Sequence, residues 1–262
     1  MYCYPDTDNV LINKFDIRDK TLLDAVERDI STQKIASLQS APPRGFLDYT
    51  HLKAIHKHIF QDIYSWAGKL RSVNIAKQNT MFCNVQFVEG SLKDVSAKLA
   101  KEKFLIGTDI ETFSSRVAYY FAEINIIHPF REGNGRSQRA FTELLGKVAG
   151  YDIDFAKVSE ADMLAASIHC WKGDESKFAD IFMNISTPIS VEDRLACANI
   201  ILNERSSALK IVRGLSEKAQ SMPDELSFNE RMKIIDNVKF SPVAEMASSS
   251  DVSKVIPRHD RG

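Results

Sequence analysis

The chain has 262 residues and a formal net charge of -1, so it can form one sizeable domain with an appendage and offers no basic field to nucleic acid. No apolar run reaches membrane-spanning length and no signal peptide opens the chain, so we expect neither a membrane nor a nucleic-acid partner. The four cysteines are widely scattered, which indicates reduced thiols in a cytoplasm, although export of the chain by a dedicated secretion machine would leave no mark here.

Three histidines, His51, His56 and His58, lie close together in an early helical segment. The step from His51 to His58 is seven residues, but no cysteine or carboxylate completes a zinc pattern. We therefore expect these histidines on a helix surface and not in a metal site.

The segment 70–88 predicts a β-hairpin. Residues 70–76 alternate like a short strand, residues 77–80 read as a turn, and residues 81–88 read as the return strand. An isolated hairpin leaves an unpaired edge, which can bind an extended segment of another protein by strand addition. The competing interpretation is a hairpin that merely covers the core.

Two helices flank a glycine-rich turn in the middle of the chain. Residues 108–111 read as a capping box for a helix whose apolar positions continue to Ile127. Pro129 disfavours helical geometry at His128, so the helix should end there. Helical spacing resumes near Gly135 and continues until Gly150.

The turn made by Gly133, Asn134 and Gly135 leads directly into the second helix. Both glycines allow backbone angles that other residues avoid. The free N–H groups and the positive dipole end of the helix then make this turn an anion site.

The side chains around the turn suit nucleotide chemistry. Arg136 and Arg139 share one helix face, where two guanidinium groups can bind the outer phosphates. Glu132 is an oxygen ligand suited to Mg²⁺. His128 can take a proton from an attacking hydroxyl, and Phe130 reads as a core anchor. Each residue alone has a common structural role; their joint, ordered occurrence favours one nucleotide site.

The later segments predict further helices and then a tail. Helices are expected from Ser159, over 177–185, over 191–220 and over 228–237. Pro188 marks a domain boundary, which gives a first domain at 1–187, a helical extension at 188–240 and a disordered tail at 241–262. The chain can also be the front portion of a longer protein.

The segment 128–139 reads His-Pro-Phe-Arg-Glu-Gly-Asn-Gly-Arg-Ser-Gln-Arg and resembles the signature of Fic-domain proteins, His-Pro-Phe-x-[Asp/Glu]-Gly-Asn-Gly-Arg-x-x-Arg. The resemblance implies an all-α Fic fold: a helical bundle with a β-hairpin flap over the active site, here with a C-terminal helical extension. It also implies a protein adenylyltransferase, which moves AMP from ATP to a tyrosine, threonine or serine hydroxyl and releases pyrophosphate. Segments near residues 4–14 and 55–68 extend the similarity to about residues 2–187.

The resemblance also assigns roles. His128 is the catalytic base, Glu132 holds Mg²⁺, the turn cradles the α- and β-phosphates, and Arg136 and Arg139 bind the β- and γ-phosphates. The flap places the target side chain over ATP, which is a co-substrate. The nucleotide-binding residues implied in this way are Lys77, Gln78, Arg131, Glu132, Gly133, Asn134, Gly135, Arg136 and Arg139.

Many Fic proteins are restrained by a helix that carries [Ser/Thr]-x-x-x-Glu-[Gly/Asn], whose glutamate pairs with the second signature arginine, here Arg139. The segments 221–225 and 241–245 have the right spacing, but Leu226 and Met246 follow and proline interrupts both. We therefore expect a separate, small antitoxin-like protein that supplies the inhibitory helix and contacts Arg139.

Two other function classes stay open. One is a phosphotransferase on the same scaffold, and the other is a binding module with weak catalysis. Rossmann and P-loop enzymes are excluded because their glycine patterns do not occur.

Overall fold

The computed structural model describes residues 2–77 and 80–221. Its helices in these ranges are α1 (Lys20–Ser37), α2 (Tyr49–Phe60), α3 (Val88–Lys101), α4 (Ile110–Ile127), α5 (Asn134–Ala149), α6 (Glu160–Trp171), α7 (Ser176–Ile185), α8 (Val191–Ile201) and α9 (Ser207–Gln220). The predicted all-α class is therefore confirmed. None of these helices combines the length and the apolar content that crossing a bilayer requires.

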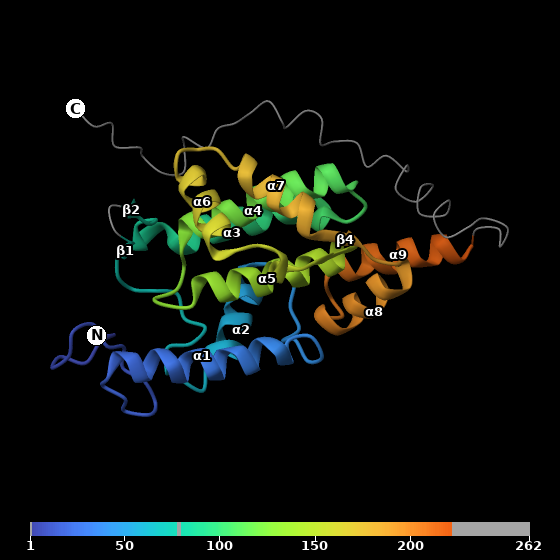
Figure 1. Ribbon diagram of the computed structural model, residues 1–262. Helices are drawn as coiled ribbons and strands as arrows, with labels where there is room; N and C mark the ends of the chain where they lie inside the picture. The colour runs from blue at the N-terminus through green and yellow to red at the C-terminus, as the bar shows by residue number, and fades with distance from the viewer. Residues whose placement is uncertain (1, 78–79, 222–262) are drawn as a thin grey trace.

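Helix α5 is the central element. Figure 1 shows α5 running through the middle of the molecule, with α1 and α2 on one side and α4, α6 and α7 on the other. It packs against α2, α4 and α8, and its apolar face is buried at Phe141, Leu144, Leu145 and Val148. The loop 128–133 therefore leads into a helix that is buried along most of its length.

The two helices around this loop begin and end close to the predicted positions. Asp109, not Thr108, is the N-cap of α4, and its carboxylate accepts a hydrogen bond from the Thr112 N–H at 2.6 Å. The Thr108 hydroxyl instead donates to the Leu105 carbonyl. Helix α5 ends at Gly150, which has a left-handed φ of 114°.

The hairpin is present but much shorter than predicted. Only β1 (Ala76–Lys77) and β2 (Thr80–Met81) pair, in antiparallel register. Residues 70–75 form no strand because Arg71 turns into the interior, and a 3₁₀ turn over Val85–Phe87 replaces the end of the return strand. The prediction of two long strands was therefore wrong.

The C-terminal extension differs from the prediction in one respect. The expected continuous helix over 191–220 is wrong, because the backbone is extended at Leu202 and the chain turns before α9. Leu202 is fully buried and pairs as an isolated bridge with Gly45, which explains the break. Helix α8 packs on α5, and buried residues of α8 and α9 belong to the same hydrophobic core as the rest.

A second two-stranded ladder was not predicted. Strand β3 (Tyr151–Ile153) pairs with β4 (Ser186–Pro188) and so joins the two ends of the α6–α7 segment. Three-residue strands give too short an alternation to recognise in a sequence. The predicted helix at 228–237 and the tail at 241–262 lie outside the described residues.

Candidate active site

The loop that follows α4 is braced by one amide side chain. Asn134 Oδ1 accepts from the Phe130 N–H, and Asn134 Nδ2 donates to the Phe130 carbonyl, both at 2.8 Å. Phe130 is buried, as predicted for an anchor. The Asn134 side chain therefore fixes the loop.

A buried histidine holds the same loop from below. The Gly68 N–H donates to His56 Nδ1 at 2.8 Å, so the proton lies on Nε2, which donates to the Glu132 carbonyl at 3.0 Å. The ring also stacks on Phe130, with a centroid distance of 3.8 Å. Burial lowers the pKa of His56 to about 4, which keeps the ring neutral.

The prediction that the three histidines lie on a helix surface was wrong for His51 and His56. His51 and His56 are buried and pack inward from α2, and His58 Nε2 lies 2.8 Å from the Ser37 hydroxyl. The apolar spacing of Leu52, Ile55 and Ile59 around them was the available signal. Their roles are structural, and His56 is a positioning residue that sequence reasoning missed.

His128 lies at the C-terminal end of α4 in a left-handed conformation, with φ 48° and ψ 65°. Its half-buried ring stacks on Phe82 just after β2, with a centroid distance of 3.8 Å. Nδ1 lies 3.2 Å from the Asn125 carbonyl, and this contact favours a proton on Nδ1. In that tautomer Nε2 carries the lone pair that a general base uses.

The structure requires glycine at position 133 but not at position 135. Gly133 has φ +76°, and a Cβ there would lie 2.3 Å from the Phe60 ring, so glycine is required. Gly135 is helical and exposed, and a Cβ there would meet only Arg139 at 3.5 Å. The expectation of a special backbone angle was right for Gly133 and wrong for Gly135.

Helix α5 starts on Gly133, which has no side chain to cap it. The first N–H groups of a helix have no partners within the helix, and its dipole adds positive potential there. Because Gly135 is exposed on this first turn, the helix start is open to an anion.

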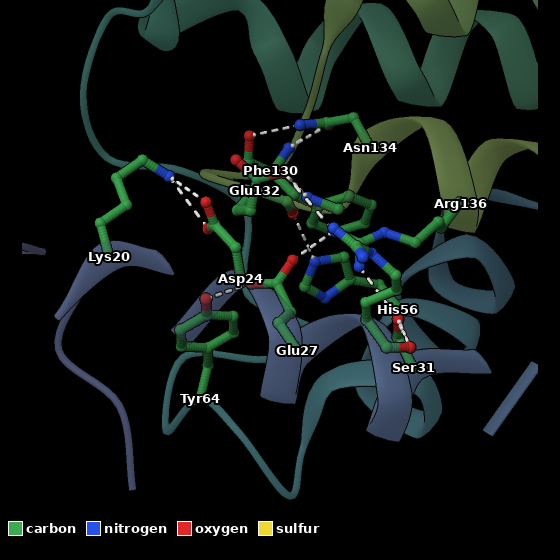
Figure 2. A network of polar contacts seen from close by, with 12 residues as sticks. Lys20, Asp24, Glu27, Ser31, His56, Tyr64, Phe130, Glu132, Asn134 and Arg136 are labelled. Carbon is green, nitrogen blue, oxygen red and sulfur yellow. Dashed lines mark hydrogen bonds and ion pairs between the residues drawn. The ribbon is translucent and has the colours of Figure 1, made fainter. Parts of the chain in front are cut away.

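Arg136 extends from this first turn toward α1, as Figure 2 shows. Its guanidinium contacts the Glu27 carboxylate at 2.5 Å and the Ser31 hydroxyl at 3.0 Å, and it lies over the Phe60 ring. Tyr64 donates a hydrogen bond to the same carboxylate. This network ties the start of α5 to α1, and no spacing in the sequence pointed to Glu27.

Arg139 lies one turn further along α5 and is half-buried. Within residues 2–77 and 80–221, no carboxylate lies within ion-pair distance of it. Desolvation and the neighbouring Arg136 lower its pKa, while the more distant Glu143 and Glu160 raise it. An anion bound at the start of α5 would stabilise the charged guanidinium of Arg139 against this desolvation and against Arg136.

Glu132 and Arg131 flank a cavity of about 380 Å³ between the loop, α1 and the N-terminal segment. Glu132 is 46% exposed at its side chain; its Oε1 accepts from the Gly133 N–H at 2.9 Å and lies 3.6 Å from Arg136. Arg131 Nη2 lies 3.8 Å from Cys3 Sγ. Arg131 thus faces the N-terminal segment and lies beside Glu132.

A metal site made only of protein ligands is not present in the described part of the chain, where no cluster of three or more His, Cys, Asp or Glu side chains could hold an ion. One half-exposed carboxylate still fits Mg²⁺, which keeps several waters and takes few protein ligands beside substrate phosphates. Lys77 lies in β1, and Gln78 lies outside the described residues.

The fold and this loop together define a helical protein with a candidate phosphate-transfer site: a histidine at one helix end and the uncapped start of the next helix. The Fic/DOC family profile matches residues 46–145, which contain the hairpin and the first part of α5.

Three curated relatives are similar over most of the chain. Protein adenylyltransferase VbhT of Bartonella schoenbuchensis is 37% identical over 204 residues, which are 78% of this chain and 42% of that protein. Probable protein adenylyltransferase y4lH of Sinorhizobium fredii is 38% identical over 68% of this chain and 91% of that protein. Probable protein adenylyltransferase Fic of Escherichia coli is 32% identical over 70% of this chain and 90% of that protein. The chain belongs to the Fic/DOC family, and it spans less than half the length of VbhT.

Solved Fic domains have the same fold. The N-terminal Fic domain of a VirB-translocated Bep effector from Bartonella quintana has a TM-score of 0.66 at 27% identity and covers 72% of this chain and 92% of that one. BepC from Bartonella tribocorum, with bound AMPPNP, has a TM-score of 0.65 at 27% identity and covers 71% of this chain and 96% of that one. The predicted Fic fold is therefore confirmed.

Proposed function

We propose that this chain is a protein adenylyltransferase, which transfers AMP from ATP to a hydroxyl side chain of a target protein. The observation that carries the proposal is the placement of His128 at one helix end, next to the uncapped start of α5. Two further facts support it: the relatives described above are named adenylyltransferases, and a solved relative holds an ATP analogue.

In the proposed reaction the target oxygen attacks the α-phosphorus, a new P–O bond forms, and the bond between the α-phosphorus and its bridging oxygen breaks. Pyrophosphate leaves with that oxygen. The hydroxyl proton passes to Nε2 of His128, while the Nδ1 contact with the Asn125 carbonyl holds the ring and its tautomer.

The phosphates are proposed to lie at the start of α5, on the backbone N–H groups of residues 133–135; the Gly133 N–H must release the Glu132 carboxylate to take part. Arg139 is proposed to bind the γ-phosphate, because its half-buried guanidinium has no ion-pair partner within the described residues. Arg136 is assigned to the β-phosphate side, but a phosphate there must share its guanidinium with Glu27. We expect Arg136 to contribute mainly by fixing the helix start.

Glu132 would hold Mg²⁺, and Arg131 would flank it. When bound, the ion neutralises phosphate charge as pyrophosphate leaves. The chain's own part is to hold the loop: His56 fixes the Glu132 carbonyl.

We propose that the hairpin holds the target by strand addition along β1 or β2, with Lys77 and Gln78 close to the nucleotide. The stacking of Phe82 on His128 supports this, because it places a segment bound to the hairpin beside the base. We also propose that a separate antitoxin-like protein supplies a glutamate to Arg139, and that the protein acts in a cytoplasm, its own or a host's.

The test uses ATP labelled at the α- or the γ-phosphate, with a lysate as the source of targets. We expect protein label from α-labelled ATP only. Label from γ-labelled ATP only would replace the proposal with a phosphotransferase, and label from neither would replace it with a binding module. His128→Ala is the control for label that does not depend on the site.

A further inference from the structure

A single buried arginine connects the hairpin to the end of α4. Arg71 is 3% exposed and lies on the chain that leads into the hairpin. Its Nη1 donates to the Val73 carbonyl at 2.7 Å, and its Nη2 donates to the Cys83 carbonyl. These two acceptors lie on the two legs of the hairpin, before β1 and after β2, so one guanidinium holds both legs.

The same guanidinium also contacts the last residues of α4. Nε donates to the His128 carbonyl at 2.8 Å, and Nη2 donates to the Ile127 carbonyl at 3.2 Å. The backbone N–H of Arg71 donates to the Pro129 carbonyl at 2.9 Å. Three consecutive carbonyls at the proposed base are therefore bound by one residue.

The partners of Arg71 in the described part of the chain are carbonyl oxygens and not carboxylates. The carbonyls at the end of a helix carry the negative end of its dipole, which suits a cation. The planar guanidinium presents five donors in a fixed arrangement, whereas a lysine ammonium is a single point. Burial lowers the pKa of Arg71, but a guanidinium remains charged at any ordinary pH.

This arrangement matters because His128 has a left-handed backbone. That conformation is unfavourable for a residue with a side chain and persists only when its surroundings hold it. The Arg71 bond to the His128 carbonyl is one such restraint, and the Phe82 ring that stacks on the imidazole comes from the hairpin leg that Arg71 also holds.

We propose that Arg71 is the positioning residue that fixes the backbone of His128 and sets the position of the hairpin relative to His128. The inference rests on the proposed function for its kinetic part only. It assigns to Arg71 no contact with substrate: the residue acts through the backbone of His128 and through the hairpin.

The first experiment compares Arg71→Lys with Arg194→Lys in the full chain. Arg194 is the matched control, because it is also buried, at 4% exposure, but lies on α8 against Gly150. We expect Arg71→Lys to lower kcat for AMP transfer about 10²-fold with little change in KM for ATP. Arg194→Lys should leave kcat near that of the wild type. Equal losses in both variants, or a wild-type kcat in Arg71→Lys, would overturn the proposal.

A second experiment uses chemical rescue. Arg71→Ala leaves a cavity the size of the guanidinium, and added guanidinium ion at sub-denaturing concentration should restore part of kcat. The ion should not restore His128→Ala. Absence of rescue in a folded Arg71→Ala protein would count against the carbonyl contacts as the source of the effect.

Two measurements need no activity and separate this proposal from the proposed function. The Arg71 Nε–H of the wild type should exchange with solvent far more slowly than that of Arg18, which is exposed and bound to Asp6. The imidazole nitrogen shifts of His128 should change in Arg71→Lys. Exchange as fast as in Arg18, or unchanged shifts, would refute the positioning role even if AMP transfer is confirmed. If the wild type transfers no AMP, the proposed function fails while these two measurements still decide the role of Arg71.

Discussion

Protonation of His56 should make the stability of this protein depend on pH in a specific window. Burial lowers the pKa of this ring from 6.5 to about 4 in the folded chain. Above pH 6.5 the ring is neutral in both states, so the full stability is present. Between pH 6.5 and about pH 4, His56 is protonated in the unfolded chain but neutral in the folded chain. The free energy of unfolding therefore decreases as the pH falls through this window.

The size of the effect follows from the shift. At pH 5 the loss is about 2 kcal/mol, since each pH unit below 6.5 costs about 1.36 kcal/mol. Other groups titrate in the same range, including the buried His51, whose pKa burial also lowers. The measurement must therefore be a difference between proteins that share this background.

His56→Gln supplies that difference. A glutamine offers one acceptor toward Gly68 and one donor toward the Glu132 carbonyl, and it does not titrate. Urea unfolding at about pH 7.5 and about pH 5 should show a loss about 2 kcal/mol smaller for His56→Gln than for the wild type. His58→Gln is the control, because it makes the same change on α2 away from the loop. The same pH dependence in the wild type and in His56→Gln would refute the reasoning.

Three further predictions concern the site. His128→Ala should lower AMP transfer by about 10²- to 10⁴-fold while ATP binding, measured by calorimetry, is retained; full transfer would make His128 structural. Glu132→Gln should abolish the Mg²⁺ dependence of transfer together with most of the activity, and an unchanged Mg²⁺ titration would place the metal elsewhere. Truncation after Ser221 should leave self-modification nearly equal to that of the full chain, whereas a sharp rise would reveal an inhibitory helix within the chain that reaches Arg139. A cut at residue 188 is unsuitable, because α8 and α9 contribute buried core residues.

The central helices could be predicted because their signals are local. An apolar repeat and a proline or glycine at the end suffice for α4 and α5, and α4 has a carboxylate cap at Asp109 as well. The order of residues in the loop likewise pointed to His128 and Glu132 without any knowledge of the fold.

The supporting contacts could not be predicted because they join distant parts of the chain. Glu27 meets Arg136 from α1, and Arg71 meets the end of α4 from the hairpin. The alternation around residues 70–76 suggested a strand, yet Arg71 points inward to bind carbonyls, and this tertiary requirement overrides the local pattern. The break between α8 and α9 has the same origin, a long-range bridge between Leu202 and Gly45.

The ladder between β3 and β4 has a practical consequence for engineering this fold. The ladder brings the two ends of residues 154–185 together, so this segment is joined to the rest of the fold at one place. Helix α7 anchors the segment through buried Phe178 and Phe182. The outer helix α6 exposes Leu164 and Ile168, and its last residue, Trp171, touches Phe82 beside the hairpin. The outer face of α6 can therefore be redesigned as a separate recognition surface next to the hairpin, while α5 and the loop before it keep their anchors.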